Sequence, residues 1–113
     1  MVTDSGRTSS VWMKEKVPSF PALKHDIEAD VCVIGAGIVG LTCAYLLLET
    51  GRSVVVLDDG PIAGGASGRT SAHLSTALDD RYYEIERLHG ADGARLAAQS
   101  HKAAIDTIES IIS

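Results

Sequence analysis

The stretch DVCVIGAGIVG at residues 30–40 limits the possible folds of this chain more than any other feature. Four apolar residues are followed at once by three glycines in the spacing G-x-G-x-x-G. The apolar run is continuous rather than alternating, which is typical of a parallel strand covered on both faces. Glycines directly after such a strand indicate a tight turn into a helix whose N-terminus accepts an anion.

The residues after the glycines continue this pattern. Residues 38–50 predict a helix, and Gly51 follows it where a left-handed C-terminal cap belongs. Four apolar side chains on one face of this helix should pack on the sheet: Leu41, Ala44, Tyr45 and Leu48. The β-branched run at residues 53–57 predicts a second buried strand. Because a helix lies between the two strands, we expect an α/β fold built on a right-handed, Rossmann-like βαβ unit.

Each residue of the glycine motif has a physical role in binding a dinucleotide. Gly35 allows the tight turn, Gly37 lets a diphosphate approach the backbone, and Gly40 lets the helix lie close to the strand. At Ile38 the first turn of the helix presents backbone N–H groups and the positive end of the helix dipole. These four residues are therefore predicted to hold the diphosphate.

An acidic residue stands at the end of the second predicted strand. Asp58 lies at about the 20-residue distance from the glycines at which an acidic side chain meets the ribose hydroxyls of the nucleotide. The adjacent Asp59 would take this role if the strand ended one residue later. We prefer Asp58 and keep Asp59 as the alternative.

A second glycine-rich stretch, GGASGRTSAHL at residues 64–74, favours FAD over NAD(P). An NAD domain needs no further cluster of donors after its second strand, whereas a larger cofactor does. Ser67, Arg69 and Thr70 offer such donors, although Arg69 is also compatible with a solvated loop arginine. A phosphate-binding loop of the ATPase type is rejected, because an arginine replaces its lysine and Ala63 replaces its first glycine.

The remaining segments predict an incomplete domain. Residues 1–29 are expected to form an extended, partly mobile leader, and residues 30–113 the N-terminal part of the nucleotide-binding domain. Two helices should follow the glycine-rich loop, one over residues 80–89 closed by Gly90, the other capped by Asp92. The last helix stays apolar to its end through Ile108, Ile111 and Ile112, which predicts that the natural chain continues or that this helix self-associates.

Composition excludes several classes of protein. The 113 residues carry a net charge of −5 and no basic stripe, so nucleic acid is not an expected partner. No apolar run approaches the length of a membrane span, and no secretory signal is apparent, so we expect a cytoplasmic protein. Two cysteines and four histidines are scattered without metal-ligand spacing, so neither a metal site nor a disulfide is predicted.

The stretch DVCVIGAGIVGLTCAYLLLETGRSVVVLDDG resembles the N-terminal signature of FAD-dependent oxidoreductases of the D-amino acid oxidase type, the group with glycine oxidase and sarcosine oxidase. The segments FPAL and GRTSAHLSTALDDRYYEIERLHGADGARLAAQSHKAAIDTIESI are similar to the subgroup with a C-terminal Rieske [2Fe–2S] domain. The resemblance implies that the glycines bind the diphosphate of FAD and Asp58 its ribose. It implies that Ser67, Arg69 and Thr70 lie along the cofactor towards the flavin ring.

The resemblance also implies an activity. Such enzymes oxidise an amine, an amino acid or a related small molecule by hydride transfer to the flavin. Their substrate-binding domain has no counterpart in these 113 residues, so we expect the isolated piece to be inactive and assign no catalytic residue. The alternative is an NAD-binding dehydrogenase or a nucleotide-sensing module, in which the glycines bind but no flavin is reduced.

Overall fold

The computed structural model describes residues 9–113, and the chain divides into two compact units, Met1–Ser71 and Ala72–Ser113. The described part of the first unit contains the elements η1 (Val11–Lys14), β1 (Val31–Ile34), α1 (Ile38–Glu49), β2 (Val54–Leu57) and η2 (Ala66–Arg69), where η denotes a 3-10 helix. The second unit contains the helix α2 (Tyr82–Ile112). Each unit is described by itself.

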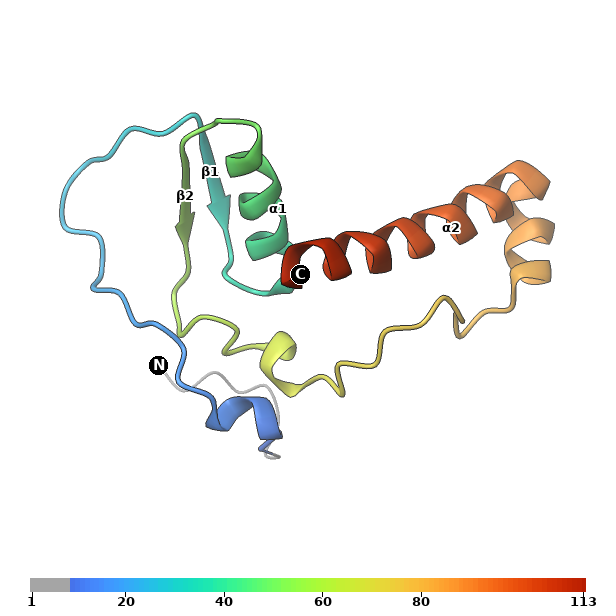
Figure 1. Ribbon diagram of the computed structural model, residues 1–113, viewed down its shortest axis with the longest axis horizontal. Helices are drawn as coiled ribbons and strands as arrows, with labels where there is room; N and C mark the ends of the chain where they lie inside the picture. The colour runs from blue at the N-terminus through green and yellow to red at the C-terminus, as the bar shows by residue number, and fades with distance from the viewer. Residues whose placement is uncertain (1–8) are drawn as a thin grey trace. The chain divides into compact units, whose positions relative to one another are not determined.

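The two strands form a parallel sheet with α1 along one face (Figure 1). Their register runs from Val31 opposite Val54 to Ile34 opposite Leu57. The predicted parallel βαβ unit is therefore confirmed, and it is compatible with part of a Rossmann-like domain. Because the strands are parallel, both carboxyl ends lie at one edge of the sheet, where the glycine turn and the loop after β2 begin.

Helix α1 packs on the sheet through small side chains. Ala44 is only 5% exposed, and Gly40, one turn earlier, lies against Val33 of β1. Of the four side chains predicted to pack on the sheet, only Ala44 is buried. Leu41, Tyr45 and Leu48 are exposed. Glycine and alanine allow the helix backbone to approach the strand closely, which turns the large side chains outward.

The opposite face of the sheet is not covered by a helix within the first unit. Successive residues of a strand point to opposite faces, so Cys32 and Ile34 belong to the face away from α1. Ile34 is 78% exposed. The expectation that both faces of the strand are covered is thus not met in this unit. Among the described residues, Ala36 and Ala44 are the only buried apolar side chains, as expected for two strands and one helix.

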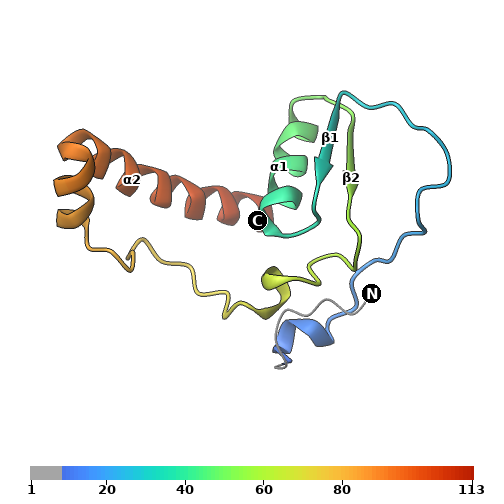
Figure 2. The ribbon, with the colours of Figure 1, turned by 180° about the vertical axis from the view of Figure 1, so that it is seen from behind.

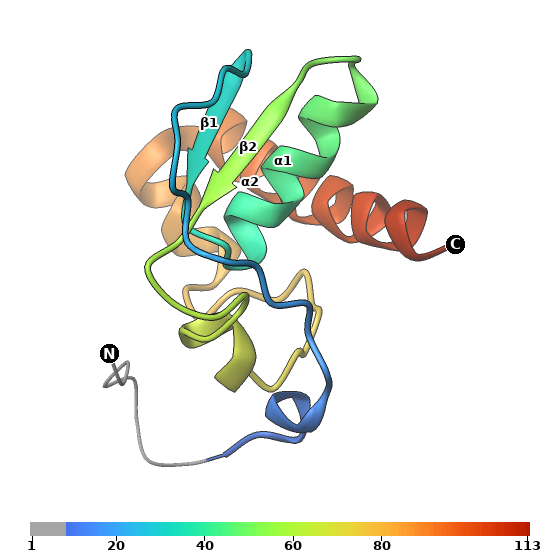
Figure 3. The ribbon, with the colours of Figure 1, turned by 90° about the vertical axis from the view of Figure 1, so that its left-hand side faces the viewer.

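The leader, expected to be extended, contains the 3-10 helix η1. From Lys14 the chain runs as an extended segment up to the start of β1 (Figure 2). η1 and η2 both lie beyond the carboxyl ends of the strands (Figure 3). The leader is therefore close to the glycine-rich loop.

The glycine-rich loop after β2 is also more regular than predicted. Its content of glycine and serine argues against a regular element up to about residue 70, but residues 66–69 form the 3-10 helix η2. Gly68 is buried, and a β-carbon at this position would overlap the carbonyl oxygen of Ala63. The chain can fold back on itself here because this residue has no side chain.

In the second unit, α2 consists of two helical segments that meet at Gly90. Gly90 has φ 75° and ψ 170°, a conformation reserved almost entirely for glycine. The two predicted helices and their break at Gly90 are confirmed, with a start at Tyr82 rather than residue 80. The predicted cap was wrong, because Asp92 lies inside the helix and its carboxylate pairs with Arg95.

The described residues contain neither a membrane-spanning helix nor a cluster of metal ligands. None of their helices combines the length and the apolar character needed to cross a bilayer. Within the same residues, no cluster of three histidine, cysteine or acidic side chains is arranged to hold a metal ion. Cys32 and Cys43 are free and exposed.

Candidate functional site

The turn after β1 requires glycine at two positions. Gly35 has φ 102°, and its N–H donates a 2.7 Å hydrogen bond to the carbonyl oxygen of Leu57. A β-carbon at Gly40 would overlap the carbonyl oxygen of Gly35. The turn and the first turn of α1 are therefore in direct backbone contact, as the glycine spacing predicted.

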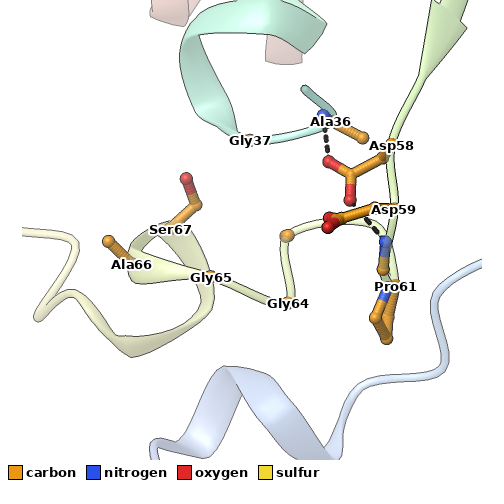
Figure 4. Close-up of a pocket in the computed structure, with 11 residues that line it drawn as sticks. Ala36, Gly37, Asp58, Asp59, Pro61, Gly64, Gly65, Ala66 and Ser67 are labelled. Atoms are coloured by element: carbon orange, nitrogen blue, oxygen red, sulfur yellow. Dashed lines mark hydrogen bonds between the residues drawn. The ribbon is translucent and has the colours of Figure 1, made fainter. Parts of the chain in front are cut away.

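The carboxylate of Asp58 binds the backbone of this turn (Figure 4). Its Oδ2 accepts a 2.6 Å hydrogen bond from the N–H of Ala36, and its Oδ1 accepts one of 2.8 Å from the N–H of Gly60. The hydrogen bond from Ala36, followed by that from Gly60, lowers the pKa of Asp58 below its ordinary value of 3.8. The side chain is therefore charged at neutral pH.

The loop after β2 lies opposite the N-terminus of α1. Ala63, which has a positive φ of 54°, donates its N–H to the carbonyl oxygen of Ala36 at 2.9 Å. The Oγ of Ser67 accepts a 2.9 Å hydrogen bond from the N–H of Ile38, the first residue of α1. Ser67 thus satisfies one of the N–H groups that have no acceptor within the helix itself.

These contacts enclose a cavity of about 210 Å³ between the glycine turn and the loop. Its walls are the residues Ala36, Gly37, Asp58, Asp59, Gly60, Pro61, Ala63, Gly64, Gly65, Ala66 and Ser67. Four of the predicted site residues therefore line one cavity: Gly37, Asp58, Asp59 and Ser67. Figure 4 shows Ser67 opposite Gly37, with the two aspartates at the other side.

Five predicted residues lie outside the cavity wall. Gly35 and Gly40 shape the turn, and Ile38 contributes its backbone N–H, while its side chain is exposed. The structure directs Arg69 back into its own loop, where Nη1 donates to the carbonyl oxygens of Gly64 at 2.7 Å and Gly65 at 3.3 Å.

Thr70, the fifth of these residues, accepts a hydrogen bond at its carbonyl oxygen from Trp12. Arg69 also carries a buried Nε that has no hydrogen-bond partner among the described residues.

Sequence reasoning missed several residues of the cavity. The glycine motif assigns no role to Ala36, yet its N–H donates to Asp58 and its carbonyl oxygen accepts from Ala63. Pro61 and Ala63 were not predicted to contribute. The position of Ala36 inside G-x-G could have indicated its place in the cavity wall, because this residue directly follows the carboxyl end of the first strand. The contribution of Ala63 depends on a positive φ that alanine rarely adopts.

The cavity combines two kinds of polar group. The N-terminus of α1 supplies N–H groups and a partial positive charge, which suit a diphosphate. The carboxylates of Asp58 and Asp59 suit donors such as ribose hydroxyls. No basic side chain is among the described residues of the wall. A β-carbon at Gly37 would come within 3.1 Å of Ser67 Oγ, so a side chain at this position would fill the space beside the serine hydroxyl. These polar groups suit a diphosphate joined to a ribose.

Comparison with known families agrees with this geometry. Residues 30–111 match the family described as FAD dependent oxidoreductase. The chain belongs to this family. The match begins at the first strand of the βαβ unit and runs through almost all of α2, so it includes every residue predicted for the site.

Two curated proteins are similar to most of this chain. The chain is 40% identical over 96 residues to the "Putative Rieske 2Fe-2S iron-sulfur protein YhfW" of Bacillus subtilis, which covers 85% of this chain and 19% of the relative. It is 41% identical over 81 residues to the gamma-glutamylputrescine oxidoreductase of Escherichia coli, covering 72% of this chain and 19% of the relative. The chain thus spans about a fifth of the length of these curated relatives. No solved structure is significantly similar to it.

Proposed function

We propose that this chain binds the adenosine diphosphate part of FAD in the cavity between the glycine turn and the loop after β2. The observation that carries the proposal is the cavity itself, which brings Gly37, Asp58 and Ser67 to the N-terminus of α1. Membership of an FAD-dependent family supports FAD as the cofactor.

The residues have separate roles in this proposal. The diphosphate lies against the backbone of Gly37, which has no side chain of its own, at the N-terminus of α1. The hydroxyl of Ser67, which accepts the N–H of Ile38, can donate its own hydrogen to a phosphate oxygen. Asp58 accepts from the ribose hydroxyls, since each carboxylate oxygen can accept a further hydrogen bond beside the one it already receives. Asp59, also in the wall, is the alternative ribose ligand.

Arg69 and Thr70 act on the cofactor through the shape of the loop. Arg69 closes the loop by donating to two of its carbonyl oxygens, and Thr70 ends η2. We propose that this closed loop continues the cofactor site towards the flavin ring.

We further propose that residues 30–113 are the N-terminal part of an FAD-binding domain, preceded by the leader at residues 1–29. The whole protein would be an oxidoreductase that oxidises an amine, an amino acid or a related small molecule. FAD, when bound, supplies the acceptor for the hydride. The residues described here bind and orient the cofactor. The printed name of the Escherichia coli relative, a gamma-glutamylputrescine oxidoreductase, supports the amine class.

A Rieske domain in the whole protein is a separate proposal, supported by the printed name of the Bacillus subtilis relative. Iron and acid-labile sulfide would be measured in the protein purified from its native source. Two irons per chain together with flavin are expected, from the composition of a [2Fe–2S] cluster. Flavin without iron would contradict this part alone.

Titration with FAD, NAD and ADP tests the main proposal. FAD should bind with quenching of its fluorescence, and ADP should compete with it because both present the same diphosphate and ribose to the cavity. NAD should bind more weakly than FAD. Tight binding of NAD by a protein that does not bind FAD would favour the dehydrogenase or nucleotide-sensing alternative.

A further inference from the structure

The leader contacts the glycine-rich loop at two hydrogen bonds. Trp12 Nε1 donates to the carbonyl oxygen of Thr70 at 3.1 Å, and the hydroxyl of Ser10 donates to the carbonyl oxygen of Gly68. Met13 lies beside Gly68, since a β-carbon built there would be 3.9 Å from Met13 Cγ. These contacts join η1 and η2 although 58 residues separate each hydrogen-bonded pair in sequence.

The other side of η2 faces the cofactor cavity. Ser67, the residue before Gly68, accepts the N–H of Ile38 at the N-terminus of α1. The leader therefore holds the backbone of η2 at Gly68 and Thr70. Ser67, next to Gly68 in sequence, lines the cavity and binds the N-terminus of α1 through its hydroxyl. Because Ser67 is bonded directly to Gly68, a displacement of the carbonyl groups of Gly68 and Thr70 would also move Ser67.

This loop needs an external support. Three of its residues between 64 and 68 are glycines, and glycine loses more conformational freedom on ordering than any other residue. A loop that is ordered before ligand binding avoids this cost when the ligand arrives. Arg69 supplies part of the order from within the loop, and the leader supplies contacts from outside it.

We propose that residues 10–13 form a leader clamp that positions Ser67 for the cofactor. Ser10 and Trp12 are positioning residues, which act on the cofactor through η2. The inference rests on the proposed function, because it assigns the clamp to the FAD site. It gives the leader a role in cofactor affinity.

Single substitutions in the purified protein test the clamp. Trp12→Phe removes the indole donor but keeps an aromatic ring, and Ser10→Ala removes the hydroxyl. Each should weaken FAD binding by about threefold to tenfold, the equivalent of one hydrogen bond. The control is Phe20→Leu, at a leader residue that is 75% exposed, and it should bind FAD like the wild type. Unchanged affinity in both clamp variants would overturn the inference.

A double-mutant cycle separates positioning from general destabilisation. Because the clamp acts through Ser67, Trp12→Phe should weaken FAD binding much less in a Ser67→Ala background than in the wild type. Full additivity of the two substitutions would overturn the proposed route through Ser67.

Amide hydrogen exchange without FAD gives a second readout. The N–H of Ile38 should exchange faster in Trp12→Phe than in the wild type, while the amides within β1 and β2 exchange at unchanged rates. Unchanged exchange at Ile38 would overturn the clamp even if affinity fell. If the wild type binds no FAD, the proposed function fails and the clamp's assignment fails with it. If the wild type binds FAD and the variants bind equally well, the clamp alone fails.

Discussion

The carboxylate of Asp58, at the end of β2, accepts a 2.6 Å hydrogen bond from the backbone N–H of Ala36, in the turn that follows β1. The two residues lie next to the paired ends of the strands, Ile34 and Leu57. One acidic side chain therefore fixes the glycine turn and at the same time lines the cavity that we assign to the nucleotide.

Substitution of the two aspartates separates their roles. Asp58→Ala should weaken FAD binding by roughly tenfold to hundredfold, because hydrogen bonds to a charged group are lost both at the ribose and at the turn. Asp59→Ala, which removes no hydrogen bond seen in the described residues, should change the affinity little. Fluorescence titration with FAD measures both. The reverse order would mean that Asp59 binds the ribose.

Acid should weaken the link between Asp58 and the turn. Since the hydrogen bonds from Ala36 and Gly60 lower the pKa of Asp58, they stabilise the folded state at pH values above its ordinary pKa of 3.8. This stabilisation is lost as the pH falls through the lowered pKa. Urea unfolding at a series of pH values should show a greater loss of stability on acidification for the wild type than for Asp58→Asn.

Asp30 serves as an internal reference for that experiment. Its pKa is also lowered, by hydrogen bonds from the backbone N–H and then the hydroxyl of Ser53. It remains in both proteins, so its contribution cancels in the comparison. Equal acid sensitivity of the wild type and Asp58→Asn would show that Asp58 has no such role.

Gly40 should be the least replaceable glycine of the turn. Gly40→Ala places a β-carbon on the carbonyl oxygen of Gly35, and relief of this overlap should cost about 1–3 kcal/mol of unfolding free energy. The matched control is Gly65→Ala, where a β-carbon meets nothing within 4 Å and φ is negative. Urea denaturation of both variants tests the difference, and equal stability would argue against the close approach.

Gly90 is expected to be essential for the break within α2. Its conformation is almost exclusive to glycine, so Gly90→Ala should lower the free energy of unfolding by about 1–3 kcal/mol. No atom lies within 4 Å of a β-carbon at this position, so the cost would come from the backbone and not from a clash. A variant as stable as the wild type in chemical denaturation would contradict this conformation.

The sequence predicted those features that depend on neighbouring residues. The strands, α1 and the break at Gly90 each follow from a local pattern of apolar residues and glycines, and the structure has all of them. The position of Asp58 at the strand end was also predictable, because strand pairing puts it beside the glycine turn. The ribose contact itself stays a prediction.

Features that depend on tertiary contacts could not be predicted. The packed face of α1 is decided by the close approach of Gly40 and Ala44, whereas apolarity alone favoured the larger Leu41, Tyr45 and Leu48. η1 and η2 span four residues each, too few to show a helical period. Their contact joins distant segments, so neither segment alone indicates it.

The central claim, that a diphosphate lies against the bare backbone of Gly37, is tested most directly by FAD titration of Gly37→Val. Gly37 has φ −85°, which valine adopts without strain, and its nearest neighbour is the hydroxyl of Ser67, so circular dichroism should show a folded protein. We expect this folded variant to bind no measurable FAD, because the valine side chain occupies the space of the phosphates. Binding at wild-type affinity would contradict the assignment of the site.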